Sequence, residues 1–336
     1  MAVRGALAAV REREDLHVIL IGPSDHLDQQ LTECGGERDR ISVHHATEVI
    51  TMDDSPVDGV RKKKEATIMV GFDLVKKGQA DAVVSAGNSG ATMAAAVRKL
   101  GRLPGISRPG IASFFPTLKN PVMLMDIGAN VDCRPQHLYQ FAVMASSCSR
   151  LLLDISKPRI GLLSIGEETG KGNALVKETY ELLRQSPLNF LGNVEGRDVY
   201  KGDVDVIVCD GFVGNVALKA SEGLAQMLAS FLKQEFNRNL MTKLVALIAL
   251  PVLKNFKSHV DHRRYNGATL LGLKGIVVKS HGSADVFSFT NALERAAEGG
   301  IPVMIFVGNA GCIQIHQVQP LRALGGVALR ALQRRG

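Results

Sequence analysis

The amino-acid sequence predicts an α/β protein whose doubly wound, mostly parallel sheet carries helices on both faces. Short apolar, β-branched runs recur along the chain, and each is followed by a turn of Gly, Asn, Ser or Asp and then by apolar residues at helical spacing. The 336 residues, 46% of them hydrophobic, suffice for a large core. We therefore expect one domain over residues 1–298, which includes a helical arm at about 237–262, and a divergent tail at 299–336.

The strands of this pattern are expected at 82–85, 122–125, 159–164, 204–209 and 275–279. A helix follows each strand; the fourth helix should reach about Phe236 and the fifth about Ala297. Parallel strands place the turns that follow them at one edge of the sheet, where ligands bind. Helix N-termini at that edge offer unpaired N–H groups and the positive end of a dipole. The pattern therefore predicts an anion site, with phosphate as the first candidate.

Composition narrows the classes of partner and compartment. The formal charge of +7 suits an anionic partner, but the absence of tryptophan and an aromatic content of 5% leave few stacking platforms for nucleic acid, which is not expected to bind. The five cysteines form no CxxC pair and the N-terminus shows no signal-peptide pattern. We expect a cytoplasmic protein with reduced thiols, without cofactor or metal; magnesium on the acidic turns is an alternative that no ligand spacing requires.

Common nucleotide motifs are absent from the sequence. It contains no G-x-x-x-x-G-K-[ST] loop and no G-x-G-x-x-G after a strand, which argues against an NTPase or a standard dinucleotide site. Ser89 lies in Gly87-Asn88-Ser89-Gly90, one residue short of the G-x-S-x-G nucleophile elbow. A serine hydrolase is therefore an alternative, not the first hypothesis.

Ordered sequence blocks resemble the PlsX family of phosphate acyltransferases. The first block is KKGQADAVVSAGNSGA at 76–91, continued by Leu100–Ile106 and Arg108-Pro109. The later blocks are DIGANVDC at 126–133, IGEE at 165–168, GNVEGRD at 192–198, CDGFVGN at 209–215, YNGA at 265–268 and KSHG at 279–282. Together they span roughly residues 16 to 297, and seven matches in order are far more specific than one glycine motif.

The resemblance implies a fold like that of phosphotransacetylase and isocitrate dehydrogenase. It implies transfer of a long-chain fatty acyl group from an acyl carrier protein thioester to inorganic phosphate. The acyl phosphate would serve the membrane glycerol-phosphate acyltransferase that begins phospholipid synthesis. The resemblance also implies a homodimer and peripheral contact with the membrane.

This reaction needs orientation and charge stabilisation more than a strong base, because phosphate is an adequate nucleophile and a thiolate leaves readily. We assign catalysis to Asn88, Ser89, Lys171 and His281. Asn88 and Ser89, with the N–H groups of Ser89 and Gly90, would hold phosphate or the developing oxyanion. The residues expected to bind substrate are Gly87, Gly90, Asn130, Gly166, Glu167, Arg197, Asp210, Gly214, Asn215 and Lys219.

Each assignment has a structural alternative. Asn88 and Ser89 could be helix caps, His281 a turn residue and Lys171 a solvated lysine. Asp126, Asp132, Glu167 and Asp210 cannot all line an anion site without compensation, because like charge repels phosphate, so some of them must pair with bases or cap helices. Cys133 and Cys209 are expected to be buried thiols, and covalent catalysis by them is an alternative. The basic run at 61–64 is either a solvated helix end or a docking patch for the acidic carrier protein.

The most apolar stretch lies at 240–257, flanked by Lys243, Lys254 and Lys257. Pro251 is expected to bend or break it. It is too short to span a bilayer. We expect either contact with a membrane surface or a buried helical hairpin or dimer interface.

Both ends depart from the family pattern. The family begins with a strand and an Asp-x-Met-Gly-Gly-Asp turn, which do not precede Leu16–Gly22 here. Residues 66–68 read Ala-Thr-Ile where the family has Ser-Ser-Met, and after about 298 a β-prone stretch at 301–307 and a basic tail replace the family helix. Three alternatives follow: a catalytically impaired relative that binds carrier protein or membrane, a phosphotransacetylase that uses acyl-CoA, and a metal-dependent decarboxylating dehydrogenase.

Overall fold

The computed structural model describes residues 2–35, 39–260, 266–297, 304–307 and 311–316. Contacts group the chain into two compact units, of which unit 1 comprises 1–101 and 273–336 and unit 2 comprises 102–272. Unit 2 is thus inserted in the sequence between two parts of unit 1. The units are described separately, and the single domain expected over 1–298 stays a prediction.

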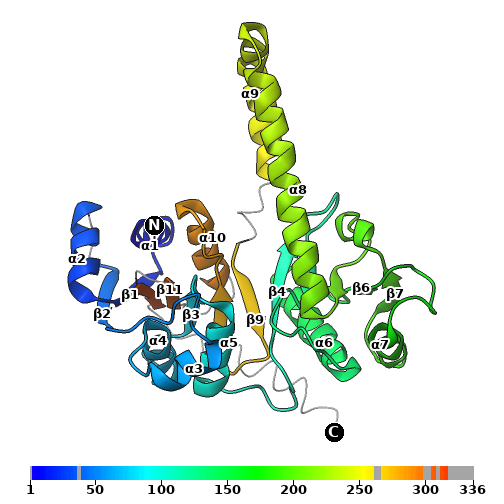
Figure 1. Ribbon diagram of the computed structural model, residues 1–336, viewed down its shortest axis with the longest axis horizontal. Coiled ribbons are helices and arrows are strands. Elements are labelled where there is room, and N and C mark those ends of the chain that lie inside the picture. The colour runs from blue at the N-terminus through cyan, green and yellow to red at the C-terminus, as the bar shows by residue number, and fades with distance from the viewer. Residues whose placement is uncertain (1, 36–38, 261–265, 298–303, 308–310, 317–336) are drawn as a thin grey trace. The chain divides into compact units, whose positions relative to one another are not determined.

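Unit 1 contains a mixed sheet with helices on its faces (Figure 1). Its helices are α1 (Ala2–Glu12), α2 (Ser24–Glu33), α3 (Pro56–Lys62), α4 (Thr67–Lys76), α5 (Ser89–Lys99) and α10 (Val286–Ala297). Its strands are β1 (His17–Gly22), β2 (Ile41–His45), β3 (Ala82–Ser85), β10 (Ile276–Lys279), β11 (Met304–Val307) and β12 (Gly311–His316). They lie in the order β2-β1-β12-β11-β3-β10. β12 is antiparallel to both neighbours, and the other pairs are parallel.

The core of unit 1 lies between the sheet and helices α1 and α10. Leu20 of β1, Val84 of β3 and Phe289 of α10 are buried in one cluster. α1 and α10 approach so closely that a Cβ on Gly5 would lie 2.7 Å from the Phe289 ring. Strands expected at 82–85 and 275–279 are confirmed as β3 and β10. The β-prone stretch at 301–307 contains β11, and the rest of the expected tail beyond β12 lies outside the described residues.

Unit 2 contains helices α6 (Pro135–Leu152), α7 (Ala174–Arg184), α8 (Gly211–Asn237) and α9 (Leu240–Val260) and a 3-10 helix, η1 (Gly196–Tyr200). Its strands are β4 (Gly110–Phe115), β5 (Val122–Met125), β6 (Ile160–Leu163), β7 (Phe190–Val194), β8 (Val206–Val208) and β9 (Ala268–Leu271). They lie in the order β9-β4-β5-β8-β6-β7. β5, β8, β6 and β7 are parallel, whereas β4 is antiparallel to β5 and β9.

Burial explains why these segments form strands. Every residue of β5 and β6 is buried, as expected for continuous apolar runs covered on both faces of a parallel sheet. α6 buries Leu138, Phe141, Ala142 and Ala145 against them. The α/β fold class expected from the sequence is therefore confirmed.

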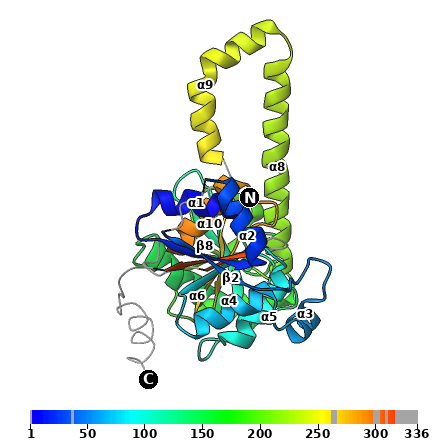
Figure 2. The same ribbon diagram turned by 90° about the vertical axis from the view of Figure 1, so that its left-hand side faces the viewer.

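The helical arm is built from the outer part of α8 and from α9, which meet at the tip of the arm and run apart below it (Figure 2). α8 ends at Asn237, close to the expected end at Phe236, and the only residues that it buries are Gly211 and Gly214 in its first turn. α9 begins at Leu240 and continues past Pro251. No helix in the described part of the chain is long and apolar enough to cross a membrane.

Candidate functional site

In unit 1, the turns after β3 and β10 lie at the same edge of the sheet. The two strands are parallel neighbours, and the Ser280 N–H donates to the Ser85 carbonyl at 2.8 Å. The Gly87 N–H donates to the Ser85 hydroxyl at 3.2 Å. The expected convergence of turns is therefore confirmed within unit 1.

Asn88 is the N-cap of α5. Its Oδ1 accepts from the Ala91 N–H at 3.0 Å, and its Nδ2 donates to the carbonyls of Thr51 and Met52, both at 3.3 Å. The side chain therefore joins the segment before α3 to the start of α5. Ser89 follows as the exposed first residue of α5. Next to it, a Cβ on Gly90 would lie 2.7 Å from Pro56 of α3.

His281 lies exposed in the turn after β10. Its Nδ1 accepts from the Ser283 N–H at 3.2 Å and lies 2.8 Å from the Ser283 hydroxyl. An accepting Nδ1 assigns the proton of the neutral ring to Nε2. The neutral imidazole therefore carries its donor on the nitrogen that does not face Ser283.

In unit 2, the turn after β5 lies against the start of α8. Both donors of the Asn130 side chain are used, since Nδ2 donates to Asp126 Oδ2 and to the Pro109 carbonyl, each at 2.8 Å. The Asn130 carbonyl accepts from the Gly211 N–H at 2.7 Å. A Cβ on Gly214 would lie 1.9 Å from the Asp126 carbonyl oxygen, so only glycine permits this approach.

Glycine is required on the other side of this contact as well. Gly128 has a φ of +134°, which side-chain residues rarely adopt. A Cβ placed on it would lie 3.6 Å from the Cβ of Asn215, which is exposed on α8. The predicted site residues Asn130, Gly214 and Asn215 are thus brought together.

Three further predicted residues of unit 2 have partners within their own elements. Asp210 is the N-cap of α8, and its Oδ1 accepts from the N–H groups of Phe212 and Val213, both at 3.0 Å. Lys219 pairs with Glu222 at 2.7 Å. Arg197 pairs with Glu195 at 2.9 Å. The charges of Asp210, Lys219 and Arg197 are therefore already partly compensated.

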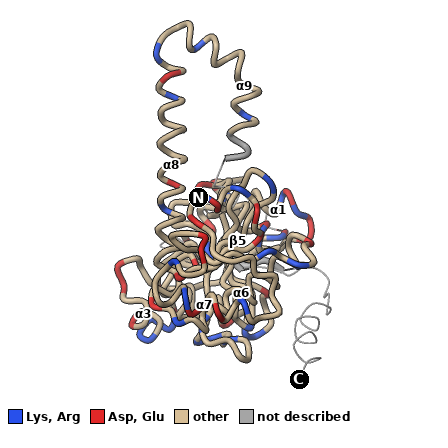
Figure 3. Tube along the Cα trace, turned by 90° about the vertical axis from the view of Figure 1, so that its right-hand side faces the viewer, with Lys and Arg blue, Asp and Glu red and all other residues tan. Residues whose placement is uncertain are grey.

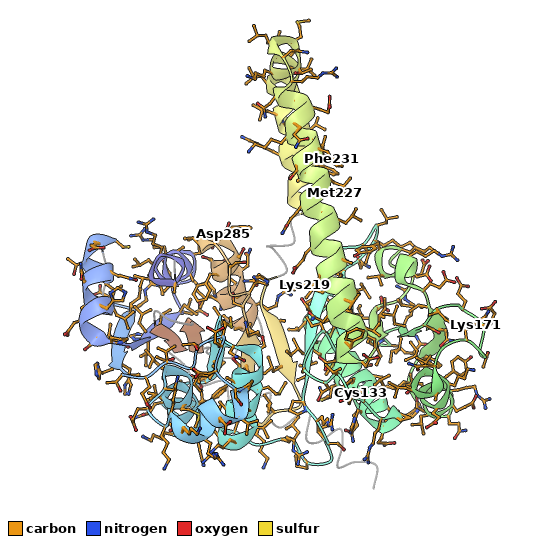
Figure 4. All side chains as sticks on the ribbon, viewed as in Figure 1. Cys133, Lys171, Lys219, Met227, Phe231 and Asp285 are labelled. Atoms are coloured by element: carbon orange, nitrogen blue, oxygen red, sulfur yellow. The ribbon has the colours of Figure 1, made fainter. Side chains whose placement is uncertain are left out.

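Lys171 lies exposed in the turn between β6 and α7 (Figure 4). Its side chain covers buried Gly166, where a Cβ would lie 2.9 Å from Lys171 Cγ and 2.7 Å from a carboxylate oxygen of Glu168. None of the ion pairs found among the described residues involves Lys171. Glu167 is exposed beside it. This turn therefore presents an ammonium group to solvent beside the start of α7.

Two residues that were not assigned to the site organise this turn. Asn173 is the N-cap of α7, and its Oδ1 accepts from the Val176 N–H at 2.9 Å. Asn193 of β7 donates from Nδ2 to the Glu168 carbonyl at 3.0 Å. The sequence signal for Asn173 is an Asn directly before a helical pattern, whereas no local signal identifies Asn193.

The thiols of Cys133 and Cys209 are poor nucleophiles. Burial, together with the carboxylates of Asp126 and Asp210, raises the pKa of Cys133 to about 12. Burial and the same two carboxylates raise the pKa of fully buried Cys209 well above its ordinary value. Both thiols therefore stay protonated near neutral pH. Within the described residues, no group of three or more His, Cys, Asp and Glu side chains is arranged to hold a metal ion.

Comparisons with known proteins agree with this architecture. A family model described as "Fatty acid synthesis protein" matches residues 1–301. A phosphate acyltransferase from Alkalilimnicola ehrlichii is 51% identical over 304 residues, which cover 89% of each chain. Two solved structures share the fold: the EutD phosphotransacetylase from Staphylococcus aureus and a phosphotransacetylase from Streptococcus pyogenes.

For both structures the TM-score is 0.59, with 89% of this chain and 90% of the other chain covered. The sequence identities are 18% and 21%, respectively, so these two matches support the fold alone. The family match covers far more than half of the chain, and the relative is similar over nearly its whole length. The chain therefore belongs to the family of fatty acid synthesis proteins, the PlsX family of acyltransferases that its sequence blocks resemble.

Proposed function

We propose that the protein transfers a long-chain fatty acyl group from an acyl carrier protein thioester to inorganic phosphate, with acyl phosphate as the product for phospholipid synthesis. Family membership and the 51% identical phosphate acyltransferase support acyl transfer to phosphate. The carrier-protein donor and the long chain are the finer parts of this proposal and have separate tests.

The observation that carries the proposal is the neutral N-cap of two helices that begin at the carboxyl ends of strands. α5 and α7 are capped by the neutral side chains of Asn88 and Asn173. A neutral cap leaves the positive end of the helix dipole uncompensated, which favours an anion. At α7, the ammonium group of Lys171 adds a full positive charge. Ser89 and Lys171 therefore keep their proposed roles as phosphate-binding groups.

The reaction has a simple balance of bonds. A phosphate oxygen attacks the thioester carbonyl, a C–O bond forms and the C–S bond breaks, and the carrier thiolate leaves and takes up a proton. N–H groups at the start of α5, from Ser89 and Gly90, would stabilise the tetrahedral oxyanion. His281, whose neutral ring carries its N–H on Nε2, is proposed to donate a hydrogen bond to the leaving thiolate, which then takes its proton from water. Because the thiols of Cys133 and Cys209 are protonated, direct transfer is favoured over a cysteine acyl-enzyme.

Apolar side chains next to the polar turns of unit 2 support a long-chain donor. Val131 follows β5, Ile165 follows β6 and Phe212 follows β8, and their exposed fractions are 60%, 81% and 60%. β5, β8 and β6 are adjacent parallel strands, so all three side chains lie at one edge of the sheet. A substrate with only polar parts would leave this apolar surface in water.

The basic run at 61–64 is the proposed docking patch for the acidic carrier. Arg61 pairs with Asp58 at 3.2 Å and Lys63 with Asp54 at 2.6 Å, whereas Lys62 and Lys64 are exposed. The carrier contact should therefore depend on Lys62 and Lys64. Changing both to Glu should raise KM for the carrier substrate, and more salt should do the same in the unchanged protein.

The apolar arm supports a homodimer and peripheral contact with a membrane that holds the next acyltransferase. Figure 3 shows α8 and α9 with few charges. The exposed apolar residues include Leu224, Met227, Leu228, Phe231 and Leu232 of α8 and Leu244, Leu247, Ile248 and Val252 of α9. Met227 and Phe231 are four residues apart and so share a helix face (Figure 4). So much exposed apolar surface is typical of an interaction site.

The two contacts of the arm have separate tests. Phe231→Asp should convert a dimer to monomers in sedimentation. Ile248→Asp should reduce co-flotation with vesicles that contain anionic lipid, since Lys243 and Lys254 flank that part of α9. A monomeric unchanged protein would contradict the dimer, and absence of flotation would contradict the membrane contact.

The function is tested by incubating the whole protein with long-chain acyl carrier protein and phosphate and measuring release of the carrier thiol. Phosphate-dependent release supports the proposal. Release only from acyl-CoA would replace the donor and indicate a phosphotransacetylase. Carrier binding without release by the folded protein would indicate a catalytically impaired relative, and nicotinamide reduction that requires magnesium would indicate a dehydrogenase.

A further inference from the structure

Asp126 is a buried carboxylate directly after β5, with 0% of its surface exposed. Its Oδ1 accepts hydrogen bonds from the backbone N–H groups of Ile111 (3.1 Å), Gly128 (3.2 Å) and Ala129 (3.1 Å). Its Oδ2 accepts from the N–H of Asn130 at 2.7 Å and from Nδ2 of the same residue at 2.8 Å. Asp126 is therefore compensated by these N–H groups, whereas the expectation that some of the acidic residues cap helices is met by Asp210.

The five donors select an ionised carboxylate. The pKa of Asp126 is raised overall, because burial outweighs the hydrogen bonds from Asn130, Ala129 and Ile111, which act in the opposite direction. Every one of these neighbours points a hydrogen at a carboxylate oxygen, so an asparagine amide would direct its own N–H₂ group at a donor. A buried donor left without an acceptor costs about 1–3 kcal/mol. The path of the turn from Gly128 to Asn130 therefore depends on the carboxylate.

The same residue contacts the start of α8 through its backbone. The Asp126 carbonyl accepts from the Cys209 thiol at 3.4 Å and lies where a Cβ on Gly214 would be only 1.9 Å away. A second link runs through Asn130, whose carbonyl accepts from the Gly211 N–H at 2.7 Å. Asp126 thus holds the turn after β5 with its side chain and faces the first turn of α8 with its carbonyl.

We propose that Asp126 is a positioning residue for acyl transfer, which fixes the start of α8 relative to the turn after β5. This inference rests on the proposed function, because the aligned groups include Asn215 and the apolar Phe212 and Val131 beside the acyl-binding edge. Asp126 itself is covered and touches no substrate. Its loss should therefore impair the rate of the chemical step more than the binding of phosphate.

The main variant is Asp126→Asn, which keeps the size of the side chain and removes its charge. We expect kcat to fall about a hundredfold, because a misplacement of about 1 Å can have that effect, while KM for phosphate changes less than about threefold. A folded Asp126→Asn protein with kcat within about threefold of the unchanged protein would overturn the inference.

Asp205→Asn is the matched control. Asp205 is also a buried carboxylate in unit 2, but it precedes β8 and pairs with Arg159 at 2.9 Å, at the end of the strand opposite Asp210. Its replacement should lower stability and leave kcat of the folded protein within about threefold of the unchanged value. An equal loss of kcat in both variants, compared at the same folded fraction, would reduce Asp126 to a stability role and overturn the inference.

Amide hydrogen exchange separates this inference from the proposed function. In Asp126→Asn, the Gly211 amide, which donates to Asn130, should exchange faster than in the unchanged protein and in Asp205→Asn. Unchanged exchange at Gly211 would overturn the inference even if the enzyme is active. Failure of the unchanged protein to release thiol from any donor would instead overturn the proposed function.

If Asp126→Asn does not fold, Asn130→Ser replaces it in the test. This variant removes one of the five donors to the carboxylate and keeps the charge. We expect about a tenfold lower kcat together with faster exchange at Gly211. A folded Asn130→Ser protein with unchanged kcat and unchanged exchange would contradict the inference.

Discussion

The starts of α7 and α8 lie at the same edge of the sheet in unit 2, but they differ in how favourable their charge is for an anion. α7 follows β6 and is capped by neutral Asn173, with Lys171 exposed in the same turn. α8 follows the neighbouring strand β8 and is capped by Asp210, whose carboxylate accepts hydrogen bonds from two N–H groups of the first turn. The carboxylate already neutralises the positive end of α8. The start of α7 is therefore better suited to an anion than the start of α8.

Removal of the Lys171 charge should have the largest effect. Lys171→Met should lower kcat/KM for phosphate about a hundredfold, because positive charge at the transferring group stabilises both binding and the transition state. Steady-state kinetics with varied phosphate measure this effect. Lys177→Met, at an exposed position of α7, is the control and should leave kcat/KM for phosphate unchanged. If the two variants behave alike, the start of α7 is not the phosphate site.

The opposite end of β8 shows what a buried carboxylate does away from the proposed site. Asp205 accepts from the guanidinium and the backbone N–H of Arg159. Burial alone would raise the pKa of Asp205, but these hydrogen bonds outweigh it, and the net pKa lies below the ordinary value. Its stabilising contribution is therefore present above the unfolded-state pKa of about 3.9 and lost as pH falls through the lower folded-state value.

Asp205→Asn should accordingly lower the free energy of unfolding by about 2 kcal/mol at neutral pH. The difference from the unchanged protein should shrink as the pH is lowered below about 4. Urea denaturation at several pH values measures it. A difference that is independent of pH over this range would show that the ion pair does not stabilise the fold through the charge of Asp205.

A charged cap at the start of α7, like the one at the start of α8, should weaken phosphate binding. Asn173→Asp keeps a good N-cap and places a carboxylate at the start of α7. We expect KM for phosphate to rise about tenfold, which corresponds to about 1.4 kcal/mol, with unchanged thermal stability. Asn173→Ser, a neutral cap of similar quality, is the control. A normal KM in Asn173→Asp would contradict the importance of cap charge.

The reverse change at α8 should have a smaller effect of opposite sign. Asp210→Asn retains the cap and removes its charge, so KM for phosphate should fall about threefold. Phosphate-dependent kinetics at low ionic strength resolve this change best, because salt screens the interaction. An increase in KM would mean that the Asp210 carboxylate contributes to catalysis in a way that its cap geometry does not explain.

Replacement of Cys133 should have the smallest effect. This thiol lies beside the carboxylates of Asp126 and Asp210, and its pKa of about 12 keeps it protonated. Cys133→Ser should retain the kcat of the unchanged protein between about pH 6 and about pH 9. Loss of activity, or an acyl-enzyme trapped on Cys133, would favour covalent transfer instead.

Apolar runs and turn residues were sufficient to predict the strands of the repeating pattern. The segments 82–85 and 122–125 are β3 and β5, because each is a continuous apolar run that ends at a polar or glycine-rich turn. β4 and β9 were not expected, since antiparallel β4 joins its neighbours without the turn and helix that marked the other strands. The pattern also missed β1, β2 and β7, although each of them has a parallel neighbour.

The roles of individual polar residues were less predictable. Asn88, expected as a ligand or a cap, caps α5, and its amide also reaches the carbonyls of Thr51 and Met52, 37 and 36 residues earlier. Those partners follow from the packing of α3 against α5. Asn173 and Asp210 are recognisable from sequence as caps, because capping depends on residues within one helical turn.

By itself, the sequence determined the fold class, the family, the positions along the chain of the strands that carry polar turns and the position of the apolar arm. Each of these depends on residue types at short spacing. Only the tertiary structure decided that Asp126 is compensated by backbone N–H groups, one of them from Ile111 on another strand, and that its carbonyl meets Gly214. Contacts between distant segments depend on how the strands and helices pack, which no local pattern encodes.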